Sequence, residues 1–235
     1  MNTKNHNIGF IHKFIPANAR ETERRTITTT TKTREQNKTF VPTLLLLHGT
    51  GGNEEDLIPL ARQIIPSEAA ILSPRGKVVE NGMYPRFFRR LAEGVFDTED
   101  LKFRTNELAN FVKDASKTYG FDMHHVIAVG YSNGANIASS MLLLRPEIIT
   151  AAILFRAMVP LVPQVLPDLT DKHIFMSSGL HDPIISKQDA ERLFNLFKKT
   201  GDNVSLHWQN RGHELFMEDI NKAKEWLLLH LPSLL

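Results

Sequence analysis

The sequence predicts an α/β fold in which a mostly parallel central sheet is covered by helices on both faces. Short apolar segments rich in β-branched residues alternate along the chain with segments whose apolar residues recur at helical spacing. The connections between successive strand segments are long enough to contain a helix, as a crossover between parallel strands requires. The runs Leu44–Leu47 and Ile148–Phe155 are almost wholly apolar, which is typical of strands buried on both faces of a parallel sheet.

The chain has 235 residues, a length that predicts one domain, 1–235, with a sizeable core. No stretch approaches the roughly 18 consecutive apolar residues that a membrane-spanning helix needs. The first ten residues lack the apolar centre of a signal peptide. The sequence contains no cysteine, which excludes disulfides, thiolate nucleophiles and thiolate metal ligands. We therefore expect a cytoplasmic protein without a membrane span.

The positive charge is concentrated at the N-terminus. The net charge is +2, but residues 1–40 alone hold eight Lys/Arg and three Asp/Glu, a local charge of +5. Interleaved threonines dilute these cations, and no dense Lys/Arg cluster of the kind that binds nucleic acid is present. We therefore expect no nucleic-acid partner.

Residues 1–40 are predicted to form an antiparallel hairpin or an arm ahead of the core. Residues 8–16 have the mixed apolar and polar pattern of a strand, and Thr26–Thr31 is β-branched throughout, which also favours a strand. The polar segment 17–39 carries no chemical motif.

The first core strand is expected over Thr43–His48 and is closed by a glycine cluster, residues 49–52. A helix should follow from Glu54 to about Ile65, because its apolar residues recur on one face. A short strand, Ala69–Leu72, comes next and is halted by a Ser-Pro pair.

Residues 75–98 are predicted to be largely irregular and to form a lid or a pocket wall, because long loops in compact domains are often functional. The sequence here places two aromatic residues, Phe87 and Phe88, among the basic residues Arg86, Arg89 and Arg90. We expect Phe87, Phe88 and Arg89 to contact the substrate, with the arginines either binding an anion or simply solvated.

The remaining elements continue the alternation of helix and strand. A helix capped by Asp97 or Thr98 should run to a stop at Gly120. The later elements are expected in the following order: a strand at 126–131 with a helix after it, a strand at 148–155, a loop at 159–167, a strand at 173–177, a helix at 186–199, a strand at 203–208 and a terminal helix reaching His230.

The pentapeptide Gly130–Gly134, Gly-Tyr-Ser-Asn-Gly, lies between a predicted strand and a predicted helix. A Gly-x-Ser-x-Gly in this context predicts a nucleophile elbow, in which a strained turn projects the Ser132 hydroxyl. Glycine is needed at positions 130 and 134 because a Cβ there would clash with the adjoining strand or helix. The helix N-terminus would also face any oxyanion formed beside Ser132.

Asp182 and His213 complete a predicted catalytic triad. Each follows its own predicted strand, and the order Ser132, Asp182, His213 is the nucleophile–acid–histidine order of one class of serine hydrolase. The carboxyl ends of parallel strands meet at one edge of the sheet, so the three side chains should converge there. His213 would take the proton of Ser132, and Asp182 would orient the imidazole and stabilise its charged form.

The main-chain N–H groups of Thr50 and Asn133 are the predicted donors of an oxyanion hole. Asn133 directly follows the nucleophile, and Thr50 lies in a glycine-rich loop whose backbone can approach a ligand closely. His48, at the start of that loop, is expected to shape it rather than to transfer protons. No metal site is expected, because His124 and His125 would be adjacent strand residues that point to opposite faces.

Six segments give the chain its resemblance to a known family: LLLLHGTGGNEEDL (44–57), PRFFRRLAEGVFD (85–97), VIAVGYSNGANIA (126–138), MVP (158–160), HDPI (181–184) and HWQNRGHEL (207–215). Through them the chain resembles the phospholipase/carboxylesterase family of α/β-hydrolases, which includes the acyl-protein thioesterases. It is most similar to the bacterial branch of small serine hydrolases related to the methylhydroquinone-resistance hydrolase.

The resemblance implies an α/β-hydrolase fold and hydrolysis without a metal or another cofactor. It also implies Ser132, Asp182 and His213 as the triad, with Thr50 and Asn133 as oxyanion donors, and makes a homodimer plausible. Acyl-protein thioesterases typically carry Gly-x-Ser-Gln-Gly, where this chain has Asn133. The substitution leaves the main-chain donor in place but argues against carrying over thioesterase specificity.

The function that the sequence predicts is that of a serine carboxylesterase acting on small acyl esters. Lysophospholipase, acyl-thioesterase or C–C hydrolase activity would use the same triad and stays open. A phosphate- or nucleotide-binding module is the alternative from another class. Its only support is the glycine loop at residues 49–52, which matches neither G-x-G-x-x-G nor G-x-x-x-x-G-K-[ST].

Overall fold

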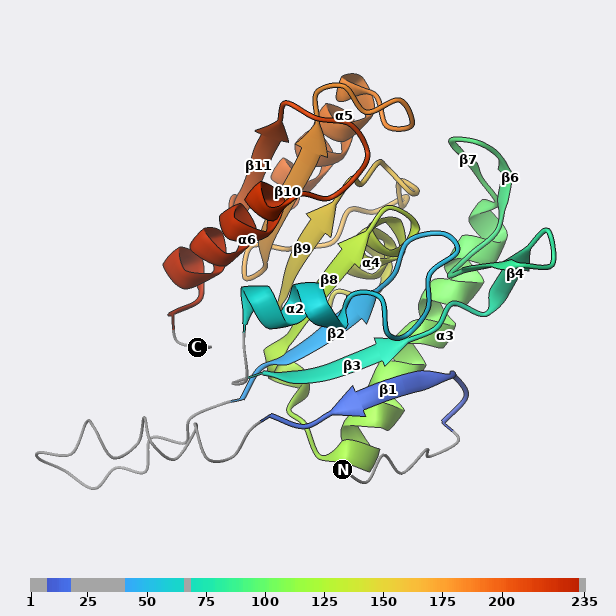
Figure 1. Cartoon of the computed structure of the whole chain (residues 1–235), viewed down its shortest axis with the longest axis vertical. Coiled ribbons are helices and arrows are strands. Elements are labelled where there is room, and N and C mark those ends of the chain that lie inside the picture. Colours follow the sequence, from blue (N-terminus) through green and yellow to red (C-terminus); the bar gives the residue numbers. More distant parts are fainter. Residues whose placement is uncertain (1–7, 18–40, 66–68, 233–235) are drawn as a thin grey trace, which may run out of the picture.

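A seven-stranded sheet forms the centre of the molecule, in the spatial order β1-β3-β2-β8-β9-β10-β11 (Figure 1). The computed structural model describes residues 8–17, 41–65 and 69–232. The strands are β1 (His12–Ile15), β2 (Thr43–Leu47), β3 (Ala70–Pro74), β8 (Val126–Tyr131), β9 (Ala151–Phe155), β10 (His173–Gly179) and β11 (Val204–Gln209). All neighbouring strands pair in parallel except β1 and β3. The predicted α/β fold with a mostly parallel sheet is confirmed.

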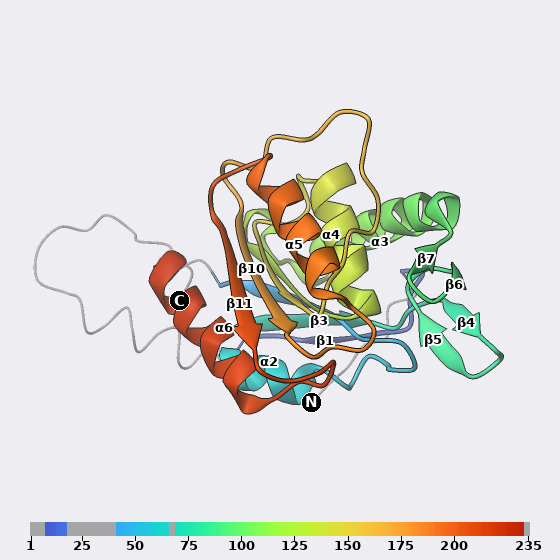
Figure 2. The same ribbon diagram turned by 90° about the horizontal axis from the view of Figure 1, so that it is seen from above.

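Helices cover both faces of this sheet (Figure 2). Their bounds are α2 (Ile58–Ile64), α3 (Thr98–Tyr119), α4 (Asn133–Leu144), α5 (Lys187–Lys198) and α6 (Met217–His230). Helices α3, α4 and α5 lie on one face, and α2 and α6 lie on the other. Strand β2 shows why both layers are needed: Leu45 and Leu47 pack in the first core, and Leu44 and Leu46 pack in the second.

The antiparallel strand expected near the N-terminus lies at the edge of the sheet. Strand β1 pairs antiparallel with β3, with His12 opposite Pro74 and Ile15 opposite Ile71. Its partner therefore comes from beyond the first core strand rather than from the adjoining stretch of sequence. The other expected strand, Thr26–Thr31, lies outside the described residues.

Residues 75–98 are more regular than the sequence predicts. They form two small antiparallel hairpins, one from β4 (Val78–Glu80) and β5 (Tyr84–Arg86), the other from β6 (Arg90–Ala92) and β7 (Val95–Phe96). Both hairpins lie to one side of the central sheet (Figure 1). The local strand pairing satisfies backbone groups that an irregular loop would leave to water.

Helix boundaries follow local capping chemistry. Helix α3 begins after Asp97, whose side chain accepts a hydrogen bond from Asp100 N, and ends at Gly120, which has φ of 74°. Helix α2 begins four residues later than expected, because Asn53 accepts hydrogen bonds from the next residues and holds them in a turn.

Two local expectations are corrected. The strand β3 includes the Ser-Pro pair that was expected to halt it, because Pro74 is the last residue of the strand, where no further ladder N–H is needed. His124 and His125 lie in one turn of 3-10 helix, Met123–His125, and not in a strand. Within residues 8–17, 41–65 and 69–232, no helix has the length and apolar character needed to cross a membrane.

Candidate active site

Ser132 lies on the sharp turn between β8 and α4. It is the N-cap of α4, with φ of 53° and ψ of −113°, a conformation that non-glycine residues seldom adopt. Its N–H donates to Phe155 O at 2.9 Å. A Cβ at Gly134 would lie 1.9 Å from Leu47 O, and one at Gly130 would lie 2.7 Å from Ala135 N. The packing of this turn therefore requires glycine at both positions.

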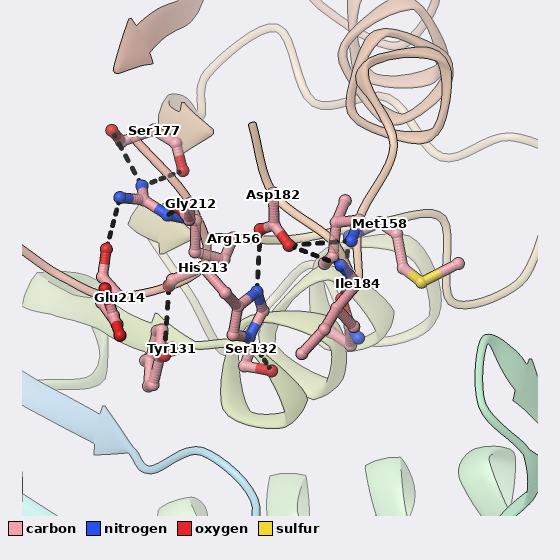
Figure 3. Close-up of polar contacts among 12 residues, drawn as sticks. Tyr131, Ser132, Arg156, Met158, Ser177, Asp182, Ile184, Gly212, His213 and Glu214 are labelled. Atoms are coloured by element: carbon pink, nitrogen blue, oxygen red, sulfur yellow. Dashed lines mark hydrogen bonds and ion pairs between the residues drawn. The ribbon is translucent and has the colours of Figure 1, made fainter. Parts of the chain in front are cut away.

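The side chains of Ser132, His213 and Asp182 meet at the carboxyl edge of the sheet (Figure 3). They follow β8, β11 and β10, and neighbouring parallel strands bring these ends together. His213 Nε2 lies 3.0 Å from Ser132 Oγ, and His213 Nδ1 lies 2.8 Å from Asp182 Oδ2. The three residues predicted as a triad are thus in one hydrogen-bonded chain.

The surroundings of Asp182 favour its ionised form. Burial raises the pKa of this carboxyl, but hydrogen bonds from His213 and from the N–H groups of Ile185 and Ile184 outweigh it, and the net pKa is lowered. Those N–H groups donate to Oδ1 at 3.0 and 2.8 Å, which leaves Oδ2 for His213. Because Asp182 Oδ2 can only accept, His213 must carry its proton on Nδ1 to donate to it. Nε2 is then unprotonated and can accept a hydrogen bond from the Ser132 hydroxyl.

The side chains of both predicted oxyanion residues are hydrogen-bonded to the end of strand β5 or to the residue after it. Asn133 N–H is the first of α4 and has no partner within the helix. The Asn133 side chain accepts a hydrogen bond from Phe87 N at 2.8 Å. Thr50 Oγ1 accepts one from Arg86 Nη1 at 2.9 Å. Thr50 N–H itself donates to no acceptor in the described part of the chain.

The glycine loop, residues 49–52, is held by hydrogen bonds within the loop and to residues outside it. Gly51 N donates to Pro85 O at 2.9 Å, and Gly52 N donates to Gly49 O at 3.1 Å. Buried His48 accepts a hydrogen bond from Gly76 N through Nε2 and donates one to Gly49 O through Nδ1. Burial lowers the pKa of His48, which favours this neutral form. Two of the four N–H groups of the loop are thus already paired, whereas a phosphate cradle uses a row of free ones.

The residues expected to contact the substrate are placed differently. Phe88 is fully buried, edge-on to Phe96 with 5.1 Å between ring centroids, so it offers no surface to a substrate in this structure. Phe87 is also buried, against His48, and reaches the site through its backbone N–H. Arg89 is exposed and pairs with Asp97 Oδ2 at 2.9 Å.

The other two arginines of this cluster are also paired. Arg90 Nε lies 2.7 Å from Glu80 Oε1, and buried Arg86 lies 3.4 Å from the same carboxylate. Each of the three arginines thus contacts a carboxylate, with Glu80 shared by Arg86 and Arg90, which argues against an anion-binding role. Among the described residues, no group of three or more His, Cys, Asp or Glu side chains is arranged to hold a metal ion.

The sequence does not single out Arg156, which lies directly after β9 and contacts the loop that carries His213. No motif marks it. The only local signal is a charged residue at the end of the apolar run Ile148–Phe155, where a buried strand leads into the site edge. Its contacts with this loop are with residues 56 and 58 positions away, so they exist only in the folded chain.

Comparisons with known proteins identify the family that the chain resembles. The model of the family described as Phospholipase/Carboxylesterase matches residues 29–231. The protein MhqD of Bacillus subtilis (strain 168), which is named as a hydrolase, is 48% identical over 183 residues, covering 78% of this chain and 90% of MhqD.

Solved structures give the same result. The crystal structure of the Bacillus cereus carboxylesterase is 47% identical, covers 94% of each chain and superposes with a TM-score of 0.82. A carboxylesterase from Mesorhizobium loti is 31% identical, covers 79% of this chain and 88% of that one, and superposes with a TM-score of 0.73.

Proposed function

The chain belongs to the phospholipase/carboxylesterase family of α/β-hydrolases, and from this premise we propose that it is a serine carboxylesterase that hydrolyses small acyl esters. One observation carries the proposal: His213 bridges Ser132 Oγ and Asp182 Oδ2 with hydrogen bonds of 3.0 and 2.8 Å. A serine hydroxyl is a weak nucleophile until a base takes its proton, and this arrangement supplies the base and its orienting carboxylate.

In the acylation half-reaction, Ser132 Oγ attacks the ester carbonyl carbon while His213 Nε2 takes the hydroxyl proton. Negative charge moves to the carbonyl oxygen, where the N–H groups of Asn133 and Thr50 donate hydrogen bonds. The tetrahedral intermediate collapses as His213 gives its proton to the departing alkoxide, and an acyl-Ser132 ester remains. Asp182 stabilises the imidazolium in between.

Deacylation repeats these steps with water. His213 Nε2 takes a proton from the water as its oxygen attacks the acyl carbon, and the same two N–H groups bind the second oxyanion. Collapse of this intermediate breaks the bond to Ser132 Oγ, which recovers the proton from His213. The products are one alcohol and one carboxylic acid for each ester consumed, and the enzyme returns to its starting state.

The surroundings of the triad support an uncharged substrate. The arginines of the nearby hairpins are paired with carboxylates, and Leu180 and Ile184, on either side of Asp182, are 42% and 45% exposed. Apolar walls discriminate acyl chains by only about 1–3 kcal/mol per methylene, so chain-length preference must be measured. Lysophospholipids and acyl thioesters would use the same triad and belong in the same panel.

The proposal is tested with p-nitrophenyl esters of graded chain length and with the Ser132→Ala variant. Ester turnover should be highest with short chains, and Ser132→Ala should abolish it while folding normally by circular dichroism. A fluorophosphonate probe should label the wild type only at Ser132, as mass mapping of its peptides would show. An alanine variant that retains its rate would refute the nucleophile. Faster turnover of thioesters or lysophospholipids would change the substrate class.

A further inference from the structure

We propose that Arg156 is a positioning residue for His213: its buried guanidinium, anchored on Asp219, fixes the backbone of the loop that carries the imidazole. The inference rests on the proposed function, because it requires His213 to act as the base. Arg156 does not touch the reacting atoms. It acts through Gly212 and Glu214, the residues on either side of His213 (Figure 3).

Arg156 is held in an unfavourable state that ordinary packing does not explain. It has φ of 56°, in the left-handed region that non-glycine residues avoid, and it is the largest fully buried side chain of the described residues. Removing a guanidinium from water is costly unless its donors are all matched. Backbone strain of this kind persists only where the surroundings over-determine it, and it is concentrated at functional sites.

The anchor of the guanidinium is Asp219, a fully buried residue in the first turn of α6. The pair is bidentate, with Nη1 2.8 Å from Oδ1 and Nη2 2.9 Å from Oδ2. Asp219 also accepts hydrogen bonds from Ser177 Oγ at 2.5 Å and from Phe216 N at 3.0 Å. Strand β10 and helix α6 therefore both fix the carboxylate, which in turn fixes the plane of the guanidinium.

The N–H groups of the guanidinium that Asp219 does not take are directed at the loop that carries His213. Arg156 Nε donates to Gly212 O at 3.0 Å, and Nη2 donates to Glu214 O at 2.7 Å. The carbonyl between them, His213 O, accepts a hydrogen bond from the Tyr131 hydroxyl at 3.2 Å. Three consecutive carbonyls are thus held, and Tyr131 directly precedes the nucleophile Ser132. These hydrogen bonds therefore fix the position of the base, His213, relative to the nucleophile, Ser132.

Lysine cannot replace arginine in this arrangement. Its ammonium keeps the charge opposite Asp219, but it lacks the planar fork that reaches Asp219, Gly212 O and Glu214 O together. Release of the loop would let the imidazole move relative to Ser132 Oγ, and a misplacement of about 1 Å can cost on the order of 100-fold in rate. Substrate binding would be affected far less, because Arg156 is itself fully buried and offers no surface to a ligand.

The test compares Arg156→Lys and Tyr131→Phe with a matched control, Ser177→Ala. The control removes the hydrogen bond from Ser177 Oγ to Asp219 and a longer contact of 3.5 Å between Arg156 Nη1 and the same Oγ. It leaves the bidentate pair with Asp219 and every bond to residues 212–214 in place. We measure kcat and KM on a short p-nitrophenyl ester, the Tm, and the low-field proton resonance of the His213 Nδ1–H bonded to Asp182. Arg156→Lys should lower kcat by about 10- to 100-fold with KM within about twofold.

The same variant should shift or broaden the low-field resonance, and Tyr131→Phe should lower kcat severalfold by freeing His213 O. Ser177→Ala should lower Tm but keep kcat and the resonance. The proposal is overturned if Arg156→Lys and Tyr131→Phe both keep the wild-type kcat, or if Ser177→Ala loses as much kcat as Arg156→Lys. If Arg156→Lys does not fold, Tyr131→Phe decides, because it removes a single hydroxyl.

Ser132→Ala separates this inference from the proposed function. If it is inactive while the Arg156 and Tyr131 variants are fully active, the positioning role is wrong and the esterase mechanism stands. If Ser132→Ala keeps ester turnover, the mechanism itself is wrong.

Discussion

The substitution Asp182→Asn tests the tautomer argument at the centre of the proposed mechanism. The Asp182 carboxylate is 1% exposed, and its two oxygens have separate tasks. Oδ1 accepts the N–H groups of Ile184 and Ile185, and Oδ2 faces His213 Nδ1. An asparagine can keep its oxygen on the two N–H groups, so the loop should retain its shape. Its NH2 group then faces His213.

A donor at that place requires an acceptor on His213 Nδ1, which moves the ring proton to Nε2. Nε2 could no longer accept the Ser132 proton, and no carboxylate would stabilise the imidazolium. We expect kcat to fall by about 10⁴-fold, which corresponds to roughly 5 kcal/mol of transition-state stabilisation. Hydrolysis of p-nitrophenyl acetate, followed over long times with high enzyme concentration, measures a loss of kcat of this size. Asp189→Asn, in the first turn of α5, is the matched control.

The pH dependence of stability gives an independent reading of the same residue. Folding lowers the pKa of Asp182, so its ionisation stabilises the folded protein above the unfolded-state pKa of about 4. This contribution is lost as the pH falls through the lower folded-state pKa. The difference in Tm between the wild type and Asp182→Asn should therefore shrink as the pH is lowered below about 4. A kcat within tenfold of the wild type, or a pH-independent Tm difference, would refute the reasoning.

Three further predictions follow from the loops around the triad. Gly134→Ala places a Cβ 1.9 Å from Leu47 O and should destabilise the protein by about 3 kcal/mol or more. An unchanged denaturant midpoint would contradict this. Asn133→Ala leaves Phe87 N–H without its acceptor, which should cost about 1–3 kcal/mol of stability. The main-chain donor remains, so kcat measured beside the unfolding curve should fall by less than about tenfold. Because folding lowers the pKa of His48, its stabilising contribution is present above the unfolded pKa of about 6.5 and lost below it. His48→Gln should therefore flatten the fall in Tm between about pH 7 and 5, and an equally steep fall would count against the buried neutral imidazole.

Local patterns in the sequence were sufficient for the elements that build the site edge. The apolar runs predict buried parallel strands, and Gly130 and Gly134 predict the tight turn at Ser132 because no side chain fits there. The placement of Asp182 and His213 after their own strands predicts convergence, since parallel strands present their carboxyl ends together. Local geometry sets each of these features, so short-range patterns can report them.

The tertiary structure alone decided which side chains of the 75–98 segment are buried. The residues Phe87, Phe88 and Arg89 look like a binding surface in the sequence, but two small hairpins turn both rings into the protein and pair Arg89 with Asp97. Burial depends on how a segment docks against distant elements. Composition alone does not encode that docking.

By itself, the sequence determined the fold class, the turn that presents Ser132 and the order of the residues that follow it, because strand periodicity, steric room at glycine and chain connectivity are properties of neighbouring residues. Only the folded chain decided that Arg156 and Asp219, 63 positions apart, would form a buried ion pair behind His213. Burial of either charge alone would be costly, so each requires the other as its partner. The two residues meet only once β9, β10 and α6 have packed together.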